Sequence, residues 1–106
     1  MKLFLFAASL RGESLNKKLI AQASQILEAQ SGVEVFLADF KEFEIPVYNG
    51  DEEDQSGVPV GAKALSEAIA SAHAVMISAP EYNGGISGAL KNALDWVSRM
   101  DQNPFE

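Results

Sequence analysis

Residues 74–96 read AVMISAPEYNGGISGALKNALDW, and this stretch carries the main fold signal of the chain. It begins with an apolar run of the kind found in strands that are buried on both faces. A turn rich in proline, asparagine and glycine follows, and then a segment whose apolar residues recur at helical spacing. A strand, a glycine-rich turn and a helix in this order form a ligand-binding corner in open α/β sheets.

The chain before this corner alternates between strand and helix patterns. Apolar runs at residues 3–8 and 33–38 predict strands, and the segments between the runs predict helices with one apolar face. The expected faces consist of Leu15, Leu19, Ile20, Ala23, Ile26 and Leu27 in the first helix, and of Val60, Ala64, Leu65, Ile69 and Ala72 in the second. Residues 39–54 are predicted to form a long loop with a solvated acidic cluster.

The resulting order is strand–helix–strand–helix–strand–helix. Such alternation predicts a parallel sheet with right-handed crossovers and helices on both faces, which is an α/β fold. Ligands of these sheets bind beyond the carboxyl ends of the strands, where the strand order reverses. In the order 2-1-3-4-5, the loops after the first and third strands flank that point.

Composition excludes several functional classes. The 106 residues suffice for one small domain, and the absence of cysteine removes disulfides, thiolate catalysis and zinc–thiolate sites. A net charge of −7 argues against nucleic acid and anionic membranes as partners. The apolar run near the N-terminus is shorter than the ~7–15 residues of a signal-peptide core, so we expect a cytoplasmic protein.

The loop after the first strand offers hydrogen-bond donors at the start of a helix. Ser9, Arg11, Ser14 and Asn16 supply two hydroxyls, a guanidinium and an amide. A helix N-terminus with such donors is suited to bind phosphate. Serine and asparagine are also ordinary capping and turn residues, with Ser14 the expected N-cap, so both interpretations stay open.

The loop after the third strand offers a different surface. Pro80 stiffens the chain, the glycines at 84 and 85 allow close backbone approach, and Tyr82 supplies a flat ring with a polar tip. These features suit a planar heterocycle, although for this loop alone a simple turn into the next helix is the slightly better interpretation. Together the two loops predict one ligand with a phosphate at one end and a planar ring at the other.

Four ordered motifs make the chain resemble the NADPH-dependent FMN reductases, a flavodoxin-like family that includes quinone and chromate reductases. Residues 8–16, ASLRGESLN, resemble the phosphate motif G-S-x-R-x-x-S-x-N, with Ala8 in place of the first glycine. Residues 80–85, PEYNGG, resemble the segment that lines the isoalloxazine ring. Residues 88–96, GALKNALDW, and 45–51, IPVYNGD, resemble a helix and a loop of the same family.

The resemblance implies a flavodoxin-like doubly wound parallel sheet and a bound FMN that takes hydride from NADPH or NADH. Electrons would pass to a small-molecule acceptor such as a flavin, quinone, azo compound or metal oxyanion. The phosphate would be held by Ser9, Arg11, Ser14 and Asn16, and the ring framed by Pro80, Glu81, Tyr82, Asn83, Gly84 and Gly85. No catalytic side chain or metal is expected, because the flavin carries the chemistry.

The family fold continues into a fourth and a fifth strand, so residues 1–106 are expected to form the N-terminal part of a single FMN-binding domain. The sheet would then be completed by the rest of a longer protein or by a second chain or fragment, and the family predicts a homodimer or homotetramer. Two alternatives stay open. One is a flavodoxin-like electron carrier without NAD(P)H turnover, and the other is an assembly fragment without cofactor.

Overall fold

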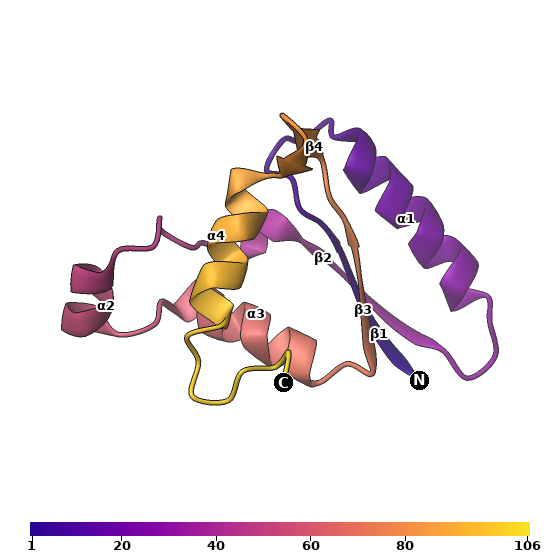
Figure 1. The fold of residues 1–106 in the computed structure, drawn as a ribbon. Helices are drawn as coiled ribbons and strands as arrows, with labels where there is room; N and C mark the ends of the chain where they lie inside the picture. The colour runs from indigo at the N-terminus through magenta and orange to yellow at the C-terminus, as the bar shows by residue number, and fades with distance from the viewer.

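The computed structural model describes residues 1–106 and contains a parallel three-stranded sheet (Figure 1). Its strands are β1 (Lys2–Ala7), β2 (Glu34–Asp39) and β3 (Ala74–Ser78), in the order β2-β1-β3. Both neighbours pair in parallel with β1, so that Phe4 lies opposite Phe36 on one side and Val75 on the other. The predicted α/β class and the first three positions of the predicted strand order are confirmed.

Helices cover both faces of the sheet, as predicted. Figure 1 shows α1 (Leu15–Glu28) on one side of the strands, and α3 (Val60–Ala70) and α4 (Gly88–Val97) on the other. Alternation along β1 explains this arrangement, because successive side chains of a strand point to opposite faces. Phe4 and Phe6 enter the core beneath α3 and α4, whereas Leu5 and Ala7 pack with α1.

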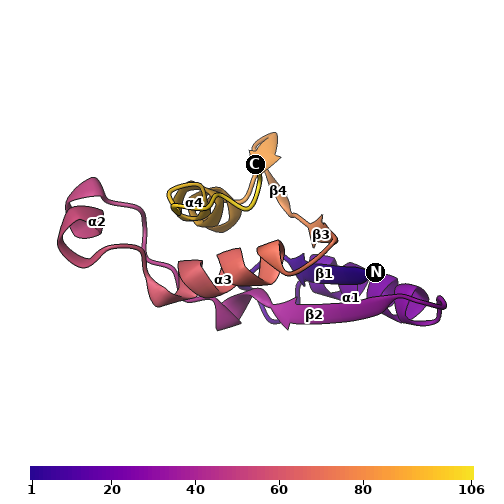
Figure 2. The ribbon, with the colours of Figure 1, turned by 90° about the horizontal axis from the view of Figure 1, so that it is seen from below.

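The segment predicted as a long loop contains regular structure, so that prediction was wrong in part. A 3-10 turn, η1 (Phe40–Glu42), follows β2, and a short helix, α2 (Gly50–Ser56), projects from the body of the fold (Figures 1 and 2). Asn49 caps α2 by accepting a hydrogen bond from the backbone N–H of Asp51. Acidic residues in the first turn then interact favourably with the helix dipole, and this explains why the acidic cluster is helical.

The predicted turn at residues 80–85 is a small hairpin. Strands β4 (Glu81–Tyr82) and β5 (Gly85–Ile86) pair antiparallel across a two-residue turn. The two turn residues, Asn83 and Gly84, have φ angles of +53° and +80°. Asn-Gly favours this type of hairpin because both residues tolerate the left-handed region.

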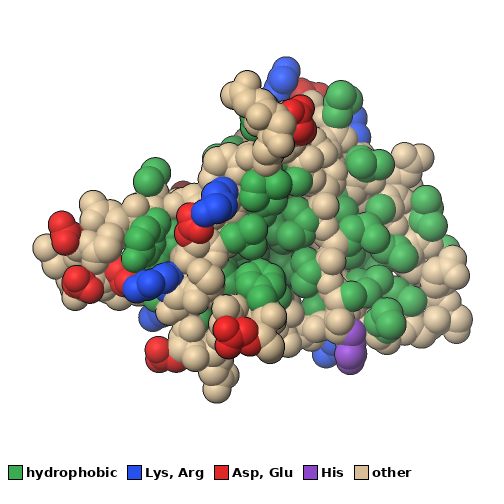
Figure 3. All heavy atoms as spheres, viewed as in Figure 1, with side chains coloured by type: hydrophobic (Ala, Val, Ile, Leu, Met, Phe, Trp, Pro, Cys, Tyr) green, Lys and Arg blue, Asp and Glu red, His purple; other side chains and the backbone are tan.

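The apolar face predicted for α1 is only partly buried. Ile20 is buried against the sheet, but Leu15, Leu19 and Ile26 are 78%, 60% and 61% exposed. Met76, which pairs with Leu5 in the register, is also exposed. Figure 3 shows the apolar side chains that gather over α1 and along β3. No helix of the structure is both long and apolar enough to cross a membrane.

Candidate functional site

The loops after β1 and β3 lie together at the carboxyl end of the sheet, as the sequence predicted. Three hydrogen bonds connect them. The backbone N–H of Ala8 donates to the carbonyl oxygen of Ser78 (2.9 Å), and the Ser78 hydroxyl donates to Oδ1 of Asn16 (2.6 Å). The Ser87 hydroxyl donates to the carbonyl oxygen of Ala8 (3.1 Å) and accepts from the backbone N–H of Leu90, which caps α4.

The sequence did not indicate Ser78 and Ser87 as site residues. Both are buried, and both belong to the framework that holds one loop against the other. Serine at the end of a strand or before a helix is common for other reasons, so its residue type carries no signal. Only the contacts across the two loops distinguish these hydroxyls.

The first loop is shaped by its own serines. The buried Ser9 hydroxyl accepts from the backbone N–H of Arg11 (3.3 Å), and the buried Ser14 hydroxyl accepts from the backbone N–H of Asn16 (3.1 Å). Ser14 is therefore the N-cap of α1, as predicted. In both serines the hydroxyl oxygen thus accepts a hydrogen bond from the loop itself, whereas the O–H group donates to no protein atom.

The same loop presents a set of donors without protein acceptors. The backbone N–H groups of Gly12, Glu13 and Ser14 donate to no protein atom, and the exposed Arg11 guanidinium forms no ion pair or hydrogen bond. These groups lie at the N-terminus of α1, where the helix dipole adds partial positive charge. A donor set of this kind fits a phosphate group, even though the chain as a whole is acidic.

The second loop exposes its residues to solvent. Within the hairpin, the Glu81 carboxylate accepts a hydrogen bond from the backbone N–H of Gly84, so this side chain stabilises the turn. Tyr82 leaves more than half of its surface exposed. The six residues from Pro80 to Gly85 are thus brought together on one hairpin, and all of them except Pro80 are exposed.

A large groove lies outside the predicted site residues. It has a volume of about 750 Å³ and lies between the loop after β1, the segment after β2 and the start of α4. Leu10, Phe40, Phe43, Ile45, Pro46 and Ala89 form its apolar lining, together with Lys41, Glu44 and Asn92. The groove therefore adjoins the first loop only through Leu10.

The other two motifs of the sequence contact each other. The carbonyl oxygen of Pro46 accepts hydrogen bonds from Nε1 of Trp96 and from Nδ2 of Asn92, both at 2.8 Å. Oδ1 of Asn92 accepts in turn from the backbone N–H of Tyr48 (2.8 Å). These contacts fix the segment before α2 onto α4.

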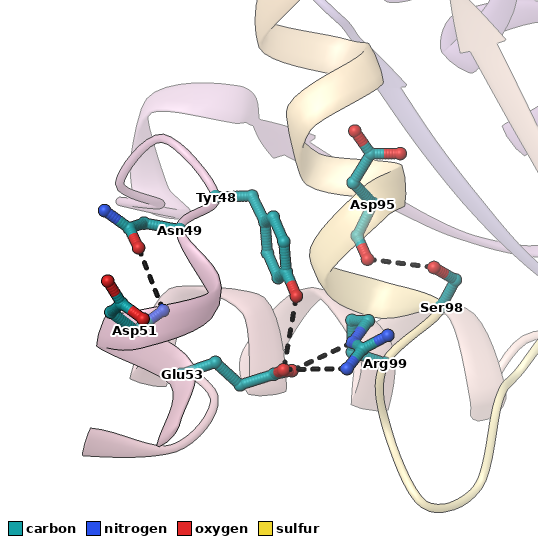
Figure 4. Close-up of polar contacts among 7 residues, drawn as sticks. All are labelled: Tyr48, Asn49, Asp51, Glu53, Asp95, Ser98 and Arg99. Atoms are coloured by element: carbon teal, nitrogen blue, oxygen red, sulfur yellow. Dashed lines mark hydrogen bonds and ion pairs between the residues drawn. The ribbon is translucent and has the colours of Figure 1, made fainter. Parts of the chain in front are cut away.

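An ion pair extends this attachment to α2 itself (Figure 4). The Arg99 guanidinium donates to both carboxylate oxygens of Glu53, at 2.8 and 3.0 Å, and the Tyr48 hydroxyl donates to the same carboxylate (3.3 Å). The guanidinium also lies 5.8 Å from the centre of the Tyr48 ring. Hydrogen bonds from Arg99 lower the pKa of Glu53 below its ordinary value of 4.5, and the same pairing raises the pKa of Arg99.

We expect the pKa of Glu53 to lie below 4.5 and to move back toward that value in Arg99→Gln. A lowered folded-state pKa stabilises the fold above the unfolded value, and this contribution is lost as the pH falls through the folded-state pKa. The attachment of α2 should therefore weaken below pH 4.5. NMR titration of the Glu53 carboxyl measures the shift.

The control for this titration is Lys91→Gln, which removes a cation from α4, the helix that ends just before Arg99. Lys91 pairs with Asp95 and makes no contact with Glu53. Loss of Lys91 should leave the Glu53 titration in place, whereas an equal effect of both variants would contradict a specific role for Arg99.

The single histidine lies at the opposite end of the sheet. Nδ1 of His73 accepts a hydrogen bond from the backbone N–H of Lys2 (2.8 Å), just before β3 begins. This contact connects the starts of β1 and β3 and places His73 away from both loops.

Comparisons with known proteins agree on one family. The family model described as NADPH-dependent FMN reductase matches residues 1–106. A quinone reductase of Escherichia coli is 37% identical over 99 residues, which cover 92% of this chain and 50% of the relative. The NAD(P)H-dependent FMN reductase PA1204 of Pseudomonas aeruginosa is 35% identical over 105 residues, covering 99% of this chain and 54% of the relative.

Among solved structures, FerB, a flavoenzyme NAD(P)H:(acceptor) oxidoreductase from Paracoccus denitrificans, matches with a TM-score of 0.76. It is 33% identical, and the match covers 99% of this chain and 55% of FerB. The chain thus spans about half the length of the curated relatives that it matches.

Proposed function

Because the chain belongs to the NADPH-dependent FMN reductase family, we propose that it contributes an FMN site to an FMN-dependent NAD(P)H oxidoreductase. The names of its relatives include quinone reductase and FMN reductase, so a quinone or a flavin is the proposed small-molecule acceptor. The observation that carries the proposal is the set of donors in the first loop that have no protein acceptor.

The phosphate is assigned to the first loop and the ring to the hairpin. Ser9, Arg11, Ser14 and Asn16 would donate to the phosphate oxygens, supported by the backbone N–H groups at the start of α1. The ring would be framed by Pro80, Glu81, Tyr82, Asn83, Gly84 and Gly85. FMN supplies hydride and electron transfer when bound, so the chain's residues serve to bind and orient it, and no catalytic side chain is proposed.

A flavin titration of the purified protein, together with any segment or second chain that completes the sheet, tests this proposal. FMN should bind, which quenching of its fluorescence would report, and NADPH oxidation should follow when quinone is added. Failure to bind FMN would contradict the proposal and favour a fragment without cofactor. Binding of FMN without NADPH oxidation would instead select an electron carrier of the flavodoxin kind.

Arg11→Ala should weaken FMN binding by about 1.5–3 kcal/mol, which is the contribution of a hydrogen bond to a charged group. This loss corresponds to roughly 10- to 150-fold in Kd. Lys63→Ala is the control, because this exposed lysine of α3 carries the same charge but lies outside both loops. Similar losses in the two variants would indicate a general charge effect and would remove Arg11 from the site.

The proposed assembly is a homodimer or homotetramer in the cytoplasm. The exposed apolar side chains of Leu15, Leu19, Ile26 and Met76 support association with a further chain or segment along β3. Apolar surface that lies next to an unpaired strand edge favours such contacts. Sedimentation of the chain measures its association state.

A further inference from the structure

We propose that Ser78 is a positioning residue that orients the side chain of Asn16, so that its NH2 group faces the phosphate site. This inference rests on the proposed function, since it concerns the same phosphate. Ser78 lies at the end of β3 and Asn16 in the first turn of α1, 62 positions apart in the chain. Neither the sequence motifs nor the residue type assigns Ser78 to the site.

The contact itself is short and directed. The Ser78 hydroxyl donates to Oδ1 of Asn16 at 2.6 Å, and no protein acceptor receives a hydrogen bond from Nδ2. Ser78 is buried, and Asn16 is half-buried. The amide therefore has one end occupied by the protein and the other end free.

This orientation matters because the two ends of an asparagine amide are chemically opposite. Oδ1 only accepts hydrogen bonds, whereas Nδ2 only donates them. A phosphate at neutral pH presents acceptor oxygens, so an amide turned the wrong way would repel it. By holding Oδ1, Ser78 leaves the donor end of Asn16 for the anion.

Ser78 is itself held firmly by the sheet. It pairs with Ala7 in the register of β1 and β3, and its carbonyl oxygen accepts from the backbone N–H of Ala8 (2.9 Å). The backbone of Asn16 is fixed separately through Ser14. Loss of the Ser78 hydroxyl should therefore free only the Asn16 side chain.

The size of the effect follows from the states that become accessible. A free asparagine side chain has three χ1 wells and two amide orientations, so about one state in six would remain competent. Apparent Kd rises in inverse proportion to the competent fraction. We therefore expect Ser78→Ala to raise the Kd for FMN by about three- to sixfold.

Fluorescence titrations with FMN and with riboflavin, which lacks the phosphate, test the inference. Ser78→Ala should weaken FMN binding and leave riboflavin binding unchanged. Ser78→Thr retains a hydroxyl and should therefore restore the wild-type ratio of FMN affinity to riboflavin affinity. Ser71→Ala is the matched control, because its hydroxyl donates to the carbonyl oxygen of Ala68 at the end of α3. That control should alter neither Kd.

Two outcomes would overturn the inference while leaving the proposed function intact. One is an unchanged ratio of FMN to riboflavin affinity in Ser78→Ala, and the other is an equal loss for both ligands. The wild-type chain provides a second measurement, since the Asn16 NH2 resonances should shift when inorganic phosphate or FMN is added. Unshifted resonances during FMN binding would exclude Asn16 as a donor. Absence of any FMN binding would reject the proposed function and the inference together.

Discussion

Replacing Trp96 by alanine should lower the free energy of unfolding by about 3–5 kcal/mol, the range found for large buried aromatic residues. The indole has no exposed surface, and its Nε1 donates to the carbonyl oxygen of Pro46 at 2.8 Å. The Tyr48 ring packs edge-on against it, with the ring centres 4.9 Å apart. Truncation would therefore leave a cavity and remove one of the contacts that hold the segment before α2.

Urea unfolding followed by circular dichroism measures this loss. Tryptophan fluorescence cannot be used, because Trp96 is the only tryptophan of the chain. Trp96→Phe is the control. It keeps most of the buried volume, and the Pro46 carbonyl retains its hydrogen bond from Asn92. We expect it to cost much less, about 1–2 kcal/mol. An alanine variant within about 1 kcal/mol of wild type would contradict the central role of Trp96.

The part of the fold that could be predicted from the sequence is the part set by local pattern. The continuous apolar run of β1 required cover on both faces, and the structure provides it with α1 on one side and α3 and α4 on the other. The alternation of strands and helices then left few topologies, and the order β2-β1-β3 is among them. Both loops could be located for the same reason, because parallel strands end at one edge of the sheet.

Features that depend on distant residues could not be predicted in this way. Helix α2 has an N-cap of ordinary type in Asn49, but its attachment comes from the pairing of Glu53 with Arg99, which lies 46 positions further along the chain than Glu53. The pairing of Ser78 with Asn16 spans 62 positions, and no residue type at either place indicates it. The apolar residues of α1 recur at helical spacing, but whether Leu19 is buried depends on which other element packs against this face of the helix.

Gly61→Ala should destabilise the protein by about 3 kcal/mol, at the upper end of the usual cost of overpacking. A Cβ atom built at Gly61 would lie 2.0 Å from the carbonyl oxygen of Glu44, and 2.7 and 2.9 Å from its carbonyl carbon and its nitrogen. All three are backbone atoms, so no side-chain rotation can relieve the overlap. Either α3 or the segment after η1 must shift.

The sign of the stability change in Gly61→Ala shows whether the close contact with Glu44 or helix propensity dominates. In an unobstructed helix, alanine is more favourable than glycine by about 0.8–1 kcal/mol, so Gly61→Ala would stabilise α3 if the space were open. Gly88→Ala is the matched control, because Gly88 begins α4 and a Cβ there meets nothing within 4 Å. Urea unfolding should therefore show a loss of stability for Gly61→Ala and no loss for Gly88→Ala, which should be neutral or slightly more stable. A stabilising Gly61→Ala would mean that α3 does not pack directly on the Glu44 backbone.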